Sequence, residues 1–326
     1  MMETAQTNGS EENGGCRPRV YRWLKILALL AFALFIIIVA LTITGRLLSS
    51  RLESETDPQA LESWDPGTSF LTTRSREVHI LDVGEGDVIL LIHGSTGSIA
   101  DWQEGVVDRL AESHRVVAFD SYGFGLSERN DSFKYGHALW TQQANDVLDA
   151  LEIERAVVVG HSAGAMTAVL LAADYPERFR GVVLTGHGFA ADPAQMLPFL
   201  PGVGELWAAQ QTIIGDAFSD SYREQAEAVH RIRGTRAAYL AFMRSQYVSP
   251  TSFRLFDGGY EDIEVPVLQM HGTLDKSQTI ESARELSSRL ADTRFVAIEG
   301  SDHFVHIEAP DQWVEEVSKF VESLRP

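Results

Sequence analysis

Short runs of Val, Ile and Leu that alternate with longer helix-like segments constrain the fold of this chain more than any other feature. Seven such runs follow residue 68: Val78–Leu81, Val88–Ile92, Arg115–Phe119, Ala156–Val159, Gly181–Leu184, Val265–Met270 and Arg294–Ile298. Apolar residues at helical spacing predict helices near 101–113, 137–152, 162–174, 279–291 and 310–324. Strands that are apolar on both faces and separated by helices indicate an α/β fold, with a mostly parallel sheet covered by helices on both faces.

One connection in this pattern is too long for a simple crossover. About 79 residues separate Thr185 from Val265, whereas a crossover between parallel strands needs roughly a dozen. The segment 187–260 carries large apolar residues at broadly helical spacing: Phe189, Phe199, Leu206, Trp207, Ile213, Ile214, Phe218, Tyr239, Phe242, Met243 and Tyr247. We therefore expect a helical cap over 187–260. Most of these residues should form the core of the cap, and a minority should face the site that the sheet carries, with Trp207 as a substrate contact.

The N-terminal region contains an apolar run that is long enough to cross a membrane. From Ile26 to Ile43 the only polar residue is Thr42, and 18 residues of helix span about 27 Å, close to the thickness of the hydrocarbon layer. A cleaved signal peptide is the alternative, but its apolar region is usually about 7–15 residues long. The sequence Thr42–Gly45 is also a poor cleavage site, which favours an uncleaved single-pass anchor.

The charges beside this run predict its orientation. Four basic residues precede it and two follow it closely: Arg17, Arg19, Arg22 and Lys25, against Arg46 and Arg51. Because basic flanks stay in the cytoplasm, we expect a disordered cytoplasmic tail over 1–23 and a transmembrane anchor over 24–45. A stalk over 46–67 then leads to the folded domain, 68–326, on the opposite side of the membrane.

Charge and cysteine content limit the partners. The formal net charge of the chain is −19, and residues 1–46 contribute +2, so the remainder carries −21. Such an acidic body repels nucleic acid. The single cysteine, Cys16, lies before the apolar run, which excludes an internal disulfide in the folded domain.

The stretch Gly160-His-Ser-Ala-Gly164 lies where an apolar strand turns into a helix. A sharp reversal strains the backbone at its apex, and small neighbours are needed to accommodate it. Ser162 would then stand at a helix N-terminus whose amides stabilise negative charge. This context predicts that Ser162 is a nucleophile.

A serine nucleophile needs a base and an acid that orients the base. Asp275 follows the strand that starts at Val265, and His303 follows the last strand, so the chain order is Ser…Asp…His. We select His303 over His306, which should lead into the final helix. Asp302 and Glu308 are expected to be solvated or capping groups. A metal site at His303 and His306 is disfavoured because no carboxylate or cysteine cluster accompanies them.

An oxyanion formed at Ser162 needs backbone donors. The amide of Ala163 follows the nucleophile, and the amide of Ser95 follows the strand end at His93-Gly94, where small residues leave it free. The run 94–98 lacks the Gly-Lys-Ser/Thr ending of a nucleotide-binding loop. His93 and Gly94 are candidate substrate contacts, as is His161, for which a structural role is the alternative.

Five motifs in order make residues 68–326 resemble the α/β-hydrolase superfamily. They are His93-Gly94 with Trp102 downstream, Asp120-Ser-Tyr-Gly-Phe-Gly-Leu-Ser127, Gly160-His-Ser-Ala-Gly164, His271-Gly-Thr-Leu-Asp275, and Gly300 to Pro310 with its two histidines. The resemblance implies a cap inserted after the sixth strand, and a structural turn at Asp120 that shapes the mouth of the pocket. Serine at 162 separates the chain from the dehalogenase and epoxide hydrolase branches, which use aspartate there.

The expected function is that of a serine esterase without a cofactor, acting on a moderately hydrophobic, lipid-like acyl substrate. Ser162 would attack the carbonyl, His303 would move the protons and Asp275 would orient His303. The same triad also serves acyl transfer to an alcohol or peroxide and C–C bond hydrolysis, because fold and triad leave the acceptor open. A hydrolase fold kept as a non-catalytic binding protein is a further alternative.

Overall fold

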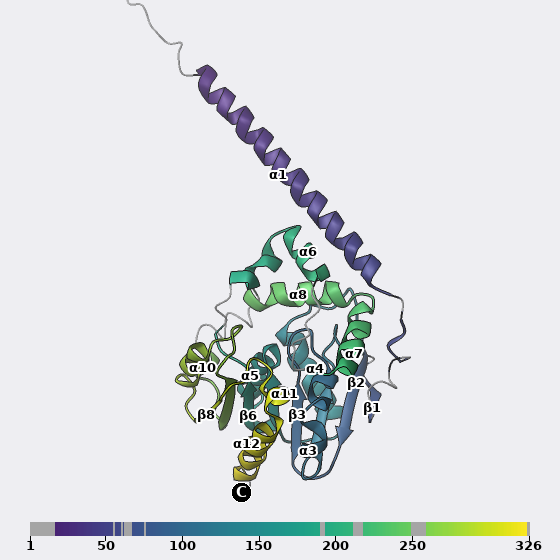
Figure 1. The fold of residues 1–326 in the computed structure, drawn as a ribbon, viewed down its shortest axis with the longest axis vertical. Coiled ribbons are helices and arrows are strands. Elements are labelled where there is room, and N and C mark those ends of the chain that lie inside the picture. Colours follow the sequence, from purple (N-terminus) through teal and green to yellow (C-terminus); the bar gives the residue numbers. More distant parts are fainter. Residues whose placement is uncertain are drawn as a thin grey trace, which may run out of the picture.

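An eight-stranded sheet organises the chain (Figure 1). The structure is a computed structural model that describes residues 17–54, 56–59, 61, 67–74, 76–189, 193–210, 218–248 and 259–324. The strands are β1 (Thr68–Thr73), β2 (Arg76–Val83), β3 (Val88–Ile92), β4 (Arg115–Phe119), β5 (Ala156–His161), β6 (Phe179–Thr185), β7 (Val267–Gly272) and β8 (Thr293–Ile298). Their order across the sheet is β1-β2-β4-β3-β5-β6-β7-β8.

Strands β3 to β8 are parallel, which confirms the mostly parallel sheet. The pairs β1–β2 and β2–β4 are antiparallel. Strand β1 was not predicted, because its sequence has only Phe70 and Leu71 among four polar residues and lacks a continuous apolar run. As an edge strand it needs fewer apolar residues than the buried centre of the sheet.

Helices cover both faces of the sheet, as predicted. On one face, α4 (His137–Ala150), α5 (Ala163–Asp174) and α10 (Ile280–Ser287) contribute to one buried cluster. On the other face, α2 (Ile99–Gln103), α3 (Val107–Ala111) and α12 (Pro310–Ser323) pack with the short helix α11 (Val305–Glu308).

The helix expected over 101–113 is two short helices, α2 and α3, with a turn between them. Gly105 lies in this turn, and a Cβ there would come within 2.5 Å of the carbonyl oxygen of His306. The close approach of α11 therefore requires glycine at position 105, where the chain turns between α2 and α3.

Four helices lie in the described part of the connection between β6 and β7, where the cap was expected. They are η3 (Pro193–Phe199), α6 (Val203–Gln210), α7 (Asp220–Arg231) and α8 (Thr235–Val248). Figure 1 shows α6 and α8 stacked over one end of the sheet. Phe242 of α8 stacks on Trp140 with ring centroids 4.2 Å apart, which ties the cap to the body. Ile213, Ile214 and the side chain of Tyr247 lie outside the described residues.

A single helix, α1 (Arg17–Leu52), contains the N-terminal apolar run. Over Tyr21–Leu52 it is the one helix in the described part of the chain that is long and apolar enough to cross a membrane. It continues to Leu52, so the first residues of the expected stalk are helical. Residues 1–16 of the expected tail lie outside the described residues.

Candidate active site

Ser162 stands at the joint between β5 and α5 in a strained backbone conformation. Its φ is +52° and its ψ is −115°, a combination that side-chain-bearing residues rarely adopt. A Cβ on Gly160 would collide with the carbonyl oxygen of Gly164, and a Cβ on Gly164 would collide with that of Ile92. The two glycines let α5 approach β3 and β5 closely, so the turn can lift Ser162 above the sheet edge.

The structure brings Asp275 and His303 together from the loops after β7 and β8. Nδ1 of His303 lies 2.7 Å from Oδ2 of Asp275. Oδ1 of Asp275 accepts hydrogen bonds from the backbone amide and hydroxyl of Ser277 and from the amide of Gln278. Burial by itself raises the pKa of Asp275, but the hydrogen bond and charge of His303 and the amide of Gln278 hold the pKa below its usual value. Asp275 is therefore a carboxylate at neutral pH.

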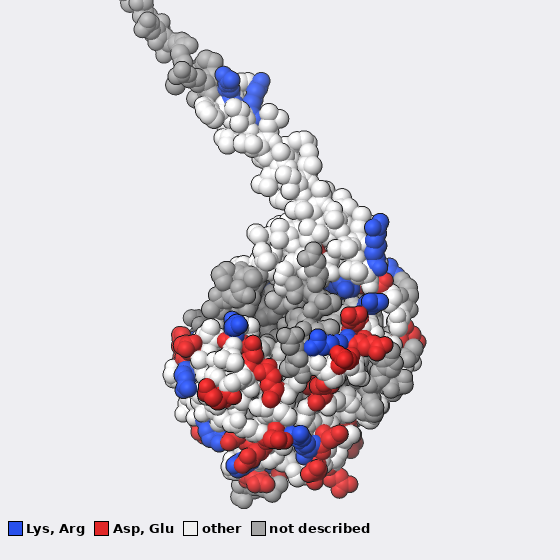
Figure 2. All heavy atoms as spheres, viewed as in Figure 1, with Lys and Arg blue, Asp and Glu red and all other residues white. Residues whose placement is uncertain are grey.

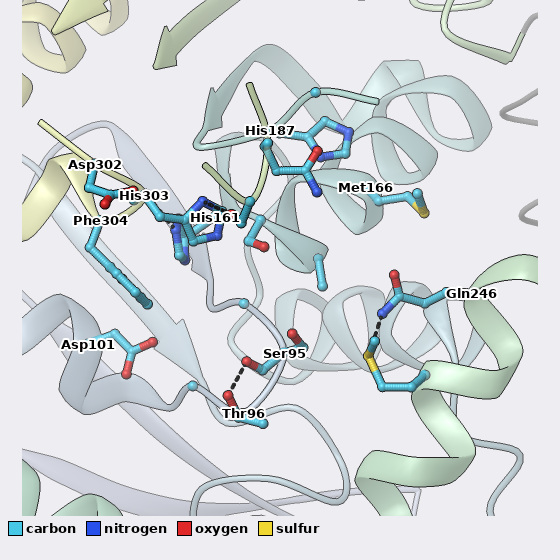
Figure 3. Close-up of a pocket in the computed structure, with 18 of the residues that line it drawn as sticks. Ser95, Thr96, Asp101, His161, Met166, His187, Gln246, Asp302, His303 and Phe304 are labelled. Carbon is cyan, nitrogen blue, oxygen red and sulfur yellow. Dashed lines mark hydrogen bonds between the residues drawn. The ribbon is translucent and has the colours of Figure 1, made fainter. Parts of the chain in front are cut away.

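Ser162 and His303 line one cavity of about 530 Å³, a size usual for small-molecule sites. Figure 3 shows His303 and His161 beside each other at this cavity. Of the other residues singled out in the sequence, Gly94, Ser95, His161, Ala163 and Trp207 line it as well. Asp275 is buried, with its carboxylate bonded to His303. Because Nδ1 of His303 is hydrogen-bonded to Asp275, Nε2 is the remaining nitrogen of its ring.

The two expected oxyanion donors also lie at this cavity. Ala163 is the first residue of α5, so its amide has no carbonyl partner within the helix. Ser95 lies in the loop after β3, next to Thr96, whose φ is +69°. Ser95 and Ala163 thus both line the cavity that Ser162 lines.

His93 was expected to contact the substrate, and its position in the structure contradicts this expectation. His93 is fully buried and is not among the residues that line the cavity. Its Nε2 accepts from the amide of Ser121 at 2.9 Å, so Nδ1 carries the proton and donates to the carbonyl of Gly94 at 2.6 Å. His93 therefore fixes the loop that carries Ser95, and both of its nitrogens are occupied by backbone groups.

Asp120 has a structural role, but it does not lie at the mouth of the pocket. It is fully buried, pairs with His79 and accepts from the amides of Ile99 and Leu126. Its carboxylate joins the loop after β4 to α2. The expected structural turn is present, and its expected role in shaping the pocket mouth is corrected, because Asp120 does not line the cavity.

His161 combines the two roles that the sequence left open. It lines the cavity, and its Nε2 donates to the backbone carbonyl of His303 at 3.1 Å. Burial holds its pKa well below the usual value, and the neighbouring His306 and His303 add to this effect. His161 therefore stays neutral and supports the backbone of His303.

His306 lies on α11, fully buried between Trp102 and Trp313 and away from the cavity lining. Burial lowers its pKa to about 3. Among the described residues no group of three or more His, Cys, Asp or Glu side chains could hold a metal ion.

Several cavity residues were missed by the sequence analysis. Ser277 contacts both Asp275 and His303, at 2.9 and 3.0 Å between the paired atoms. The hydroxyl of Tyr222 in α7 donates to Asp101 of α2 at 2.6 Å, which joins cap and body at the cavity wall. The spacing Asp-x-Ser at 275–277 was a usable signal for an Asx-type turn, whereas nothing local links Tyr222 to Asp101.

Comparison with known proteins agrees with this architecture. The profile of the α/β hydrolase fold family matches residues 87–310. A 2-hydroxymuconate semialdehyde hydrolase of a Pseudomonas species is 40% identical over 128 residues, 39% of this chain and 44% of that protein. A 2-hydroxy-6-oxo-2,4-heptadienoate hydrolase of Pseudomonas putida is 26% identical over 260 residues, 75% of this chain and 92% of that protein.

A solved structure of similar fold extends over more of the chain. The crystal structure of a membrane phospholipase A, a bacterial virulence factor, superposes with a TM-score of 0.64 at 20% identity and covers 95% of this chain and 99% of its own. The family profile spans more than two thirds of the chain, and the eight-stranded, mostly parallel sheet agrees with that fold. The chain therefore belongs to the α/β-hydrolase fold family and is a hydrolase of that family.

Proposed function

We propose that this protein is a serine hydrolase that cleaves a carboxylic ester of a moderately hydrophobic substrate through an acyl-enzyme intermediate. The observation that carries the proposal is the Asp275–His303 pair at one cavity with Ser162, whose backbone is strained in the manner of a nucleophile elbow. The cap supplies the aromatic and apolar side chains of Trp207, Tyr239 and Met243 to the cavity wall.

In the proposed mechanism, Oγ of Ser162 attacks the ester carbonyl and its proton moves to Nε2 of His303. The amides of Ser95 and Ala163 hold the resulting oxyanion, while the carboxylate of Asp275 stabilises the imidazolium. The proton then passes to the leaving alkoxide, and the acyl group stays on Ser162. Water gives its proton to His303 as it attacks the acyl-enzyme, and the acid departs as Ser162 recovers its hydrogen.

A second candidate is hydrolysis of a C–C bond next to a carbonyl. It is favoured by the two Pseudomonas relatives, which are hydrolases of 2-hydroxymuconate semialdehyde and of 2-hydroxy-6-oxo-2,4-heptadienoate. The cavity also has polar lining residues, His187, Gln246 and Lys276, that could hold a charged substrate. A full-length chain that consumes 2-hydroxymuconate semialdehyde faster than any ester would favour this candidate.

We also propose that α1 anchors the chain in a membrane by a single pass with its N-terminus in the cytoplasm. The length and hydropathy of Tyr21–Leu52 and the basic residues before the apolar run support it.

The first experiment compares wild type with Ser162→Ala. We expect a fluorophosphonate probe to label the wild type and to leave the variant unlabelled. Turnover of p-nitrophenyl butyrate and octanoate should fall by about 10³-fold or more in the variant, since losing the nucleophile leaves only the oxyanion site and binding. Unlabelled wild-type protein of native circular dichroism would contradict the proposal and favour a binding protein. A strong preference for acetate or for charged esters would count against the hydrophobic substrate.

A further inference from the structure

The membrane helix α1 is docked against the cap along one stripe. Every residue from Tyr21 to Ile37 is exposed. Beyond that point a stripe at helical spacing is covered, formed by Ile38, Leu41, Thr42, Gly45, Leu48 and Ser49. The partner of α1 along this stripe is mainly α6 of the cap (Figure 1).

Two glycines make this contact close. A Cβ on Gly45 would come within 2.6 Å of the backbone of Glu205. Gly202 has a φ of +82°, and a Cβ there would lie 2.7 Å from the Cβ of Leu41 and 2.8 Å from the carbonyl oxygen of Ile38. Backbone approach through small residues is the usual packing of helices in membranes, so α1 and the start of α6 form a fitted contact.

The free part of α1 is too short to cross a bilayer by itself. Its uncovered apolar portion, Ile26–Ile37, spans about 18 Å, whereas the hydrocarbon layer is about 30 Å thick. Eight further residues, Ile38–Gly45, complete about 30 Å. They include Ile38, Leu41 and Thr42, which lie next to Gly202 of the cap, and Gly45, which lies next to Glu205. A spanning α1 therefore carries this part of the cap to a depth of about 5–10 Å below the edge of the hydrocarbon layer.

The cap segment at this depth has the chemistry of a membrane-inserted surface. Residues 196–209 include one charged group, Glu205, and its carboxylate accepts from Arg244 and from the amide of Gly202. Met196 and Leu200 are 53% and 52% exposed, unusual for large apolar side chains outside α1. Figure 2 shows charged side chains gathered over the body away from the helix, with mainly uncharged atoms where the helix joins it.

We propose that the cap segment from Met196 to Trp207 is inserted into the interfacial layer of the bilayer, with Met196 and Leu200 in contact with lipid. The inference rests on the proposed anchoring by α1. Because Trp207 of the same segment lines the cavity, the bilayer forms the outer boundary of one wall of the site. A substrate dissolved in lipid can then approach that wall without first entering water.

Site-specific labelling of the full-length chain tests the proposal. Cys16→Ser removes the only cysteine, and Leu200→Cys then carries an environment-sensitive NBD group in phosphatidylcholine vesicles. We expect shallow doxyl-labelled phosphatidylcholine to quench this group about twofold or more and aqueous iodide to have little effect. Glu315→Cys on α12, in an exposed ion pair far from α1, is the control and should respond to iodide alone.

A third label distinguishes failure of the anchor from failure of the cap insertion. NBD at Phe32→Cys should be quenched by deep doxyl lipids if α1 spans the bilayer. Quenching at 32 together with free access of iodide at 200 would overturn the cap insertion and leave the anchor standing. Protection of position 200 from iodide without quenching by lipid would show a protein partner or second copy on the patch, which also overturns the proposal. No quenching at 32 would reject the anchor and the insertion with it.

A matched pair of variants tests the docking that sets the depth. Gly45→Leu adds a side chain where the cap backbone approaches, whereas Thr44→Leu adds one on the exposed side of α1. We expect the lipid quenching at position 200 to fall in the first variant and to stay at the parent level in the second. Equal quenching in both variants would mean that the α1–α6 contact does not hold the cap in the bilayer.

Discussion

At the scale of single residues, the candidate acid of the site is held by more groups than the triad contains. Asp275 receives three hydrogen bonds on Oδ1 from Ser277 and Gln278, and His303 on Oδ2. The hydroxyl of Ser277 also lies 3.0 Å from Nδ1 of His303. Ser277 therefore acts as a positioning residue for both partners.

Ser277→Ala should lower kcat for p-nitrophenyl butyrate by about 3- to 10-fold and leave KM nearly unchanged. The loss corresponds to about one hydrogen bond that orients Asp275 and His303. Ser277→Thr keeps the hydroxyl and should restore most of the rate. If Ser277→Ala raised KM with kcat intact, or if threonine failed to rescue, the positioning role would be wrong.

His306 makes stability depend on pH in a predictable direction. Its pKa is lowered to about 3 by burial, against about 6.5 in the unfolded chain. Between these values the unfolded state binds one more proton, so the stability contributed by neutral His306 is complete above about pH 6.5 and falls as the pH drops toward 3. The ring of His161 lies 4.8 Å from that of His306. The charge of His303 adds to the effect of burial on the pKa of His306.

We expect His306→Phe to reduce the acid sensitivity of folding. At pH 5.0 one such histidine costs about 2 kcal/mol, so the fall in Tm between pH 7.5 and 5.0 should be about 4 °C smaller in the variant than in wild type. Differential scanning fluorimetry at both pH values measures this difference, with pH 7.5 as the internal control. Parallel Tm profiles for the two proteins would show that His306 is not a source of the acid sensitivity.

At the scale of elements, stacked aromatic rings and hydrogen bonds join the cap to the body. The stacked pair Phe242–Trp140 fixes α8, and the hydrogen bond Tyr222–Asp101 fixes α7 beside the cavity. Burial raises the pKa of Asp101, while the neighbouring His93 and the hydrogen bond from Tyr222 oppose that rise. Loss of the Tyr222 hydroxyl would leave a buried carboxyl group with fewer partners.

Tyr222→Phe should lower Tm by about 3–6 °C, because an underpartnered buried polar group costs about 1–3 kcal/mol. We also expect faster proteolysis within the cap and a higher KM for octanoate than for butyrate esters. Tyr175→Phe, at a tyrosine that is 37% exposed, is the control and should change neither property. An unchanged Tm and KM in Tyr222→Phe would mean that the Tyr222–Asp101 hydrogen bond does not help to hold α7.

At the scale of the whole molecule, charge and hydropathy are separated along the chain. The body carries the acidic excess, and the long apolar helix α1 is preceded by basic residues. Figure 2 shows this separation: acidic side chains lie over the body, and the uncharged middle of α1 lies between basic residues near its two ends. This distribution suits a body in water that is tethered to a bilayer by one helix.

The topology is tested with the native cysteine. Cys16 precedes the span, so a membrane-impermeant maleimide added to intact cells should leave it unlabelled and should label it after permeabilisation. The chain should also stay in the membrane pellet after carbonate extraction. Labelling of Cys16 in intact cells would reverse the proposed orientation, and loss of residues 1–45 by intact mass would indicate a cleaved signal peptide.

The elements of the body could be predicted because their signals are local. A short apolar run such as Val88–Ile92 between turn residues favours a buried strand. The glycines around Ser162 favour a tight turn between β5 and α5. The order of Ser162, Asp275 and His303, each after a strand end, was enough to expect them at one edge of a parallel sheet. These inferences use spacing along the chain and need no knowledge of distant contacts.

Only the tertiary structure decided the features that join distant residues. His93 does not line the cavity, because backbone groups bind both of its ring nitrogens. Tyr222 of the cap is hydrogen-bonded to Asp101 of the body. Helix α1 packs against α6 through Gly45 and Gly202. The tertiary structure also added β1 at the sheet edge, where pairing with β2 replaces a continuous apolar run. Periodicity reports which face of an element is buried, whereas the partner of that face depends on how the whole chain packs, and no local pattern contains that information.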